Sequence, residues 1–188
     1  MRTLSEWLQR LSSRHAVLGL SAVAALLLQC SVFPHLAVFG LRPDLLGVVV
    51  ACWGLLYGPA EGFVGGLAVG LVQDLAFGGY LGLFALAKTL TGFVAGVAES
   101  KIFKETIWVP TAAVGLLVLF HELVVWICLR ALSVPAPVRD IFTVGFGTAA
   151  YSLVTAPLVY RQLFLYRAAE LARERETTGG NGQALARR

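Results

Sequence analysis

Long apolar stretches, separated by short polar or glycine- and proline-containing segments, occupy most of this chain of 188 residues. Such stretches are typical of helices that cross a membrane, which need about 20 apolar residues when they stand upright. The pattern predicts six of these helices in an all-α integral membrane bundle, and several are short enough to require a compact arrangement. The predicted spans cover residues 16–33, 44–57, 62–77, 82–98, 107–129 and 141–160.

Polar segments flank the predicted bundle at both ends. Leu4, Trp7, Leu8 and Leu11 recur at helical spacing, which predicts a short amphipathic helix on the membrane surface. The tail is expected to be helical to about residue 176 and frayed beyond it. The sequence therefore predicts three parts, which are an interfacial helix over residues 1–15, a transmembrane domain over 16–160 and a basic tail over 161–188.

Composition and charge agree with a membrane protein and indicate its orientation. Only 14% of the residues are charged, whereas soluble domains contain about 25%. Lys and Arg number three before the first span, two in the loop over 99–106 and six in the tail, against three in the loops of the opposite side. Because cytoplasmic segments carry the excess of positive charge, both termini are expected in the cytoplasm of a multi-pass protein.

Glycines mark the face along which the third and fourth spans are expected to meet. Small residues at every fourth position let helix backbones approach closely inside a membrane. A packing contact between these two spans is therefore predicted. The glycines concerned are Gly62, Gly66 and Gly70 in the third span and Gly92 and Gly96 in the fourth.

Charged residues extend the same two faces. Asp74 follows Gly70 by four residues, and Lys88 precedes Gly92 by four. An isolated charge at the centre of a membrane helix costs about 2.5–3.5 kcal/mol on insertion scales. One hypothesis is that Asp74 and Lys88 form an ion pair between the two spans. The alternative is that Lys88 extends to the membrane surface while Asp74 accepts a hydrogen bond from a loop amide.

Glu122 is the third charged residue placed in the interior of a predicted span, after Asp74 and Lys88. It follows His121, but the sequence lacks the second histidine that a His-Glu-x-x-His zinc site would require. We expect Glu122 to form a hydrogen bond within the bundle, with a polar cavity or a proton relay as the alternative. Cys30, Cys52 and Cys128 lie far apart and support neither a disulfide framework nor a metal site. No catalytic, cofactor or metal site is predicted.

Several short motifs follow one another between residues 29 and 99. The second span begins with Pro43-Asp44-Leu45, and Gly58-Pro59 forms the next turn. Gly66 and Gly70 then lead to Asp74 in a Gly-x-x-x-Gly-x-x-x-Asp run, and Leu-Gly-x-x-Ala-Leu-Ala follows over residues 81–87. In this order the motifs resemble the rod shape-determining protein MreD family. The second half of the chain resembles it only in the number of spans, and family members often carry an aromatic residue where this chain has Lys88.

The resemblance implies a function and a set of partners. It implies a non-enzymatic protein of the bacterial inner membrane that belongs to the cell-elongation (rod) complex and takes part in peptidoglycan synthesis and rod cell shape. The implied partners are the transmembrane segment of MreC, the actin-like MreB and the elongation-specific peptidoglycan synthases. A homodimer is compatible with the small-residue faces, and the basic segments are expected to meet anionic lipid or MreB.

The resemblance also implies a fold, and this fold leaves other functions open. The six-helix bundle is similar to the substrate-binding subunits of energy-coupling-factor vitamin transporters. A vitamin-binding subunit is therefore the alternative function, with Asp74, Tyr80, Lys88 and Glu122 as candidate pocket residues. An enzyme or flippase acting on a lipid carrier is a third reading, for which the sequence contains no recognisable motif.

Overall fold

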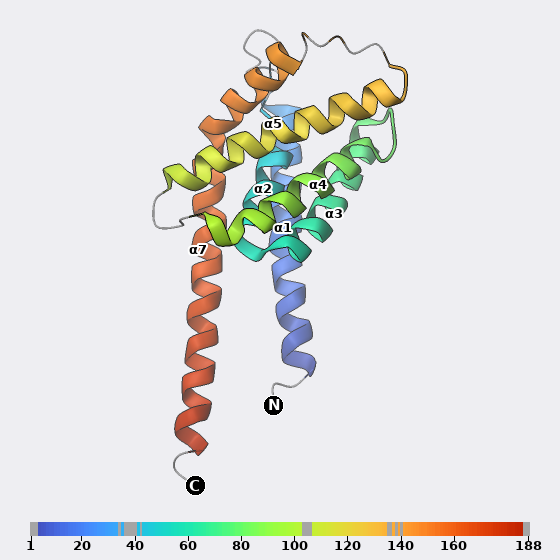
Figure 1. The fold of residues 1–188 in the computed structure, drawn as a ribbon. Coiled ribbons are helices and arrows are strands. Elements are labelled where there is room, and N and C mark those ends of the chain that lie inside the picture. The colour runs from blue at the N-terminus through green and yellow to red at the C-terminus, as the bar shows by residue number, and fades with distance from the viewer. Residues whose placement is uncertain are drawn as a thin grey trace.

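The described part of the molecule is a bundle of helices (Figure 1). The computed structural model describes residues 4–33, 35, 41, 43–102, 107–134, 137, 139 and 141–185. A short 3-10 turn, Glu99–Lys101, follows α4, and a π-helical turn, Ile141–Gly145, leads into α7. The α-helices are α1 (Leu4–Ser31), α2 (Leu45–Tyr57), α3 (Pro59–Phe77), α4 (Leu83–Ala98), α5 (Trp108–Ala131) and α7 (Phe146–Leu185).

Five helices in the described part are long and apolar enough to cross a membrane. They contain the segments Arg14–Ser31, Pro59–Phe77, Leu83–Lys101, Trp108–Ala131 and Phe142–Arg173. The second predicted span forms α2, which has 13 residues and is therefore about 20 Å long. This length is less than the hydrocarbon thickness of about 30 Å. The described residues thus form five helices of spanning length and the shorter α2.

The short helix α2 is the centre of the bundle. Twelve of its 13 residues are buried, and Trp53 has no exposed surface. A helix that is apolar on every face is stable only where other helices surround it. The other helices α1, α3, α4, α5 and α7 all pack against α2. The core of the molecule is thus built around one buried helix.

The two ends of the chain form longer helices than the sequence pattern predicted. Residues 4–14 continue directly into the first span as part of α1, because that segment contains no proline and no glycine to interrupt a helix. At the other end, α7 continues from the sixth predicted span to Leu185. Its segment over 161–176 is rich in Ala, Leu, Glu and Arg, which favour helix. In Figure 1 the start of α1 and the end of α7 project from the same end of the bundle.

Candidate functional site

The helices α3 and α4 lie against each other with their backbones in direct contact at the predicted glycines (Figure 1). A Cβ atom added to Gly62 would lie 2.7 Å from the carbonyl carbon of Gly92, and one added to Gly66 would lie 2.8 Å from Cα of Thr89. Gly70 faces the backbone of Ala85, and Gly96 faces that of Pro59. Glycine at these positions is thus what allows α3 and α4 to approach so closely.

Lys88 leaves this contact toward α2 and pairs with Asp44. The Lys88 side chain has no exposed surface, and its Nζ atom lies 2.7 Å from Oδ2 and 3.0 Å from Oδ1 of Asp44. Asp44 is 6% exposed. The ammonium group therefore donates to both oxygens of one carboxylate, in surroundings where water cannot replace either partner. Such charge-assisted hydrogen bonds are about twice as strong as neutral ones.

Asp44 is held in place because it also begins α2. Its Oδ1 atom accepts a hydrogen bond of 2.9 Å from the amide of Gly47, as expected for a helix N-cap. Its own amide donates to the hydroxyl of Ser152 on α7, at 3.1 Å. A Cβ atom on Gly47 would lie 2.8 Å from Cγ of Asp44 and 3.4 Å from Nζ of Lys88. These contacts with α2 and α7 therefore fix the orientation of the Asp44 carboxylate toward Lys88.

His121 of α5 completes a buried polar cluster, which we define as Asp44, Lys88, His121 and Ser152. The Nε2 atom of His121 lies 3.4 Å from Oδ2 of Asp44. The ring of His121 is buried and stacks against Phe84, with centroids 6.4 Å apart. The four residues come from α4, α5, α7 and the N-terminus of α2. The cluster therefore joins four helices around Asp44, with Lys88 and His121 at its carboxylate and Ser152 at its backbone amide.

Asp74 does not pair with Lys88, so the ion pair predicted between them is wrong. The Asp74 carboxylate is buried and accepts three backbone hydrogen bonds, from Gly82 at 2.9 Å and from Phe84 and Ala85 at 3.0 Å each. These amides belong to the start of α4, where the first N–H groups of a helix have no partner within the helix. Asp74 at the end of α3 therefore caps α4, as in the alternative that the sequence left open for this residue.

Removing this cap should destabilise the hairpin of α3 and α4. We expect Asp74→Ala to lower the free energy of unfolding by about 1–3 kcal/mol, because buried amides lose their acceptor. Asp74→Asn retains one acceptor oxygen and should cost clearly less. Thermal unfolding of the purified protein in detergent measures both. Equal losses for Ala and Asn would show that the charge of Asp74, and not its capping oxygens, is what the fold requires.

The other predicted residues lie around these contacts. Glu122 is half-buried on α5, next to His121 and against Gly145. The contact of α5 with Asp44 is made by its neighbour His121. Gly58 has a φ of +91°, a conformation that favours glycine, and links α2 to Pro59 in the first turn of α3.

Tyr80, one of the residues considered for vitamin binding, is 49% exposed. A cavity between α1, α2 and α7 is lined by none of the residues considered for vitamin binding.

Two members of the cluster were not predicted as site residues. His121 was considered only as a zinc ligand, and Ser152 was not singled out at all. Among the described residues, no group of three or more His, Cys, Asp or Glu side chains is placed to hold a metal ion. A usable signal existed for Asp44, because an aspartate that follows proline and precedes an apolar run is typical of a helix N-cap.

Comparison with known proteins gives one match. A family model described as rod shape-determining protein MreD matches residues 12–165. The matched segment contains the four residues of the cluster, Asp74 and all the glycines of the contact between α3 and α4. No curated protein and no solved structure matches the chain.

Proposed function

The chain belongs to the rod shape-determining protein MreD family, and we propose that it is a non-enzymatic component of the cell-elongation complex in the bacterial inner membrane. Membership of this family implies a role in determining rod shape. We propose in addition that the bundle binds the transmembrane segment of MreC. Through MreC, and through contacts with MreB and the elongation-specific peptidoglycan synthases, the protein would help to organise wall synthesis.

One observation supports a scaffold in particular, namely how three of the charged groups within the bundle are used. Asp44 and Lys88 neutralise each other and Asp74 caps a helix, so that each contributes to joining helices. The outward surface is apolar, with Leu75 of α3, Leu116 of α5 and Val154 of α7 each more than two-thirds exposed. Such a surface suits contact with lipid or with the span of another protein.

The proposed orientation of the protein in the membrane follows from the distribution of its positive charges. The N-terminal segment and the tail are the two most basic parts of the sequence. The start of α1 and the end of α7 project from the same end of the bundle (Figure 1). Basic segments on one side of the membrane support a cytoplasmic location for that side. We therefore propose that both termini lie in the cytoplasm. The buried polar cluster lies at the N-terminal end of α2, away from the two termini, and we propose that this end faces the periplasm.

Depletion of the protein in its own rod-shaped host should convert rods to spheres within a few generations. A plasmid copy of the wild type is expected to restore rods, measured as the ratio of cell length to width. Affinity purification of the restored protein should recover MreC in about equal amount. Unchanged cell shape after depletion would contradict the proposed role, and recovery of a pair of ATPases in place of MreC would favour the transporter subunit.

A further inference from the structure

Glu122 of α5 differs from the other two charged residues in the interior of the predicted spans. Lys88 pairs with Asp44, and Asp74 accepts three backbone hydrogen bonds. Within the part of the chain that the structure describes, the Glu122 carboxylate makes no hydrogen bond and no ion pair. The described contacts of the bundle thus leave this one carboxylate unpaired.

The sequence around Glu122 makes an unpaired carboxylate costly. Residues 114–120 and 123–129, on either side of His121 and Glu122, are all uncharged. They belong to Trp108–Ala131, a helix that is long and apolar enough to cross a membrane. Ionisable side chains inside such helices are rare because of their cost, and they normally pair with another group or mark a functional site. We therefore looked for a partner of Glu122 outside the bundle.

The Glu122 side chain lies in the contact between α5 and the turn that precedes α7. A Cβ atom on Gly145 would lie 3.5 Å from Cβ and 4.0 Å from Cγ of Glu122, with no atom of the carboxylate within 4 Å. The hydrocarbon part of Glu122 therefore packs on this glycine, and the side chain as a whole is half-buried. Gly145 ends the π-helical turn Ile141–Gly145, a form of helix that is rare and frequent at functional sites.

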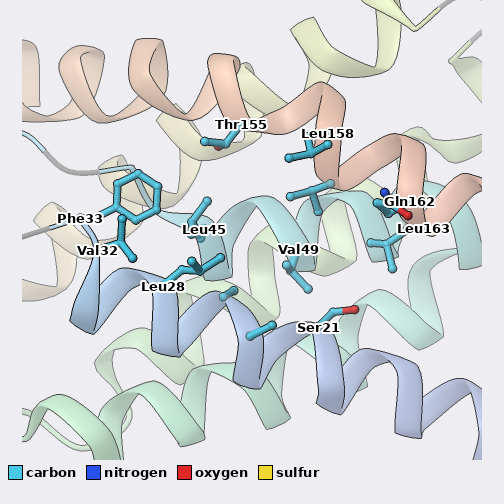
Figure 2. A pocket seen from close by; sticks show the side chains of 13 residues that line it. Ser21, Leu28, Val32, Phe33, Leu45, Val49, Thr155, Leu158, Gln162 and Leu163 are labelled. Carbon is cyan, nitrogen blue, oxygen red and sulfur yellow. The ribbon is translucent and has the colours of Figure 1, made fainter. Parts of the chain in front are cut away.

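The surface beside this contact is apolar. Leu123 follows Glu122, and Val144 and Phe146 flank Gly145; all three side chains are exposed. This surface differs from the apolar cavity between α1, α2 and α7 (Figure 2), whose lining contains no charged residue that would select an occupant. A partner that fits the surface at Glu122 is apolar over most of its contact and carries a positive charge at one point.

A transmembrane helix of another protein meets these requirements better than a lipid or a second copy of the chain. A phospholipid carries its charged groups at the membrane surface, outside the hydrocarbon region. A second copy offers no cation, because Lys88 is the one Lys or Arg in the interior of the predicted spans and is buried with Asp44. A helix of another protein brings apolar side chains for the surface and an Arg or Lys for the carboxylate.

We propose that Glu122 and the exposed apolar residues beside it form a docking face for a transmembrane helix of another protein, and that an arginine or lysine within that helix pairs with Glu122. The pair would neutralise Glu122 as Lys88 neutralises Asp44 within the bundle. Hydrogen bonds between such oppositely charged groups are about twice as strong as neutral ones. The inference rests on the proposed function, in which the chain binds other membrane proteins of the elongation complex.

Photocrosslinking of the full chain in host membranes tests the proposal. With p-benzoylphenylalanine in place of Leu123, one membrane protein should be captured through a span that contains Arg or Lys, identified by mass spectrometry. The matched control is the same crosslinker in place of Leu67 on α3, since both leucines are 40% exposed. Glu122→Lys should lower the yield of the Leu123 adduct at least tenfold through repulsion of like charges. Replacing the basic residue of the captured span by glutamate should then restore the yield.

Glu122→Leu separates a docking role from a structural one. Because Glu122 has no partner among the described residues, this variant should unfold in detergent at the wild-type temperature or above it, while its Leu123 adduct falls several-fold. A clear loss of thermal stability would assign Glu122 to the fold and overturn the proposal. So would an adduct of undiminished yield, an adduct with lipid alone, or a captured span without Arg or Lys.

Failure of this inference and failure of the proposed function give different results. If Glu122→Leu keeps the adduct and restores rods as fully as the wild type, the docking face is wrong and the role in cell shape stands. If depletion leaves cell shape unchanged while the exchange of charges still restores the adduct, the docking face stands and the proposed function is wrong.

Discussion

Replacing Lys88 by methionine is expected to lower the free energy of unfolding by about 3–5 kcal/mol, because it leaves the Asp44 carboxylate buried without its ammonium partner. The native pair is bidentate and has almost no contact with the exterior. Methionine has a similar length and no charge, so the loss reports the charge and not the packing. The measurement is denaturation of the purified protein in detergent with increasing dodecyl sulfate.

A double-mutant cycle identifies the partner of Lys88. Asp44→Asn combined with Lys88→Met should recover part of the loss, since neither residue then leaves a buried charge, and the coupling should fall between about 0.5 and 3 kcal/mol. The matched control is Asp74→Asn with Lys88→Met, for which the two losses should come close to adding. A larger coupling for Asp74 than for Asp44 would show that the pairing in the structure is wrong.

The outline of the fold could be read from the sequence because hydrophobic stretches and their breaks are local signals. Gly58-Pro59 and the Gly78–Gly82 segment mark real helix ends. The length of α1 and α7 was misjudged for a related reason, since amphipathic or charged composition changes the surroundings of a helix without ending it. The central position of α2 could be inferred only in part, from a run that is apolar on every face.

The partner of Lys88 could not be predicted from the sequence. Asp44 and Asp74 both lie near the end of the bundle where α4 begins, and the spacing of one hairpin favoured Asp74. The Asp74 carboxylate instead accepts hydrogen bonds from the amide of Gly82, at the end of the turn, and from those of Phe84 and Ala85 in the first turn of α4. These three donors satisfy Asp74 without Lys88. The contact of Lys88 with Asp44, 44 residues away, and the approach of His121 and Ser152 depend on how α5 and α7 pack. No local sequence pattern encodes this packing.

The second large effect is expected at Gly66. A Cβ atom there would lie 2.7 Å from the carbonyl carbon of Lys88 and 2.8 Å from Cα of Thr89, and backbone atoms cannot move aside as a side chain can. Gly66→Ala should therefore cost at least about 1–3 kcal/mol, although alanine favours helix over glycine by about 1 kcal/mol. The control is Gly19→Ala in α1, where nothing lies within 4 Å, and which should be neutral or slightly stabilising.

The position of Gly66 gives this prediction a second readout. The backbone that an added methyl group would displace is that of Lys88 itself, so the displacement should also weaken the contact with Asp44. Gly66→Ala and Lys88→Met are then expected to cost less together than the sum of their separate effects, whereas Gly19→Ala should add to Lys88→Met without coupling. If Gly66→Ala leaves both unfolding and cell shape unchanged, the close approach of α3 to α4 does not hold in the membrane. A loss with no coupling to Lys88 would instead limit the role of Gly66 to packing.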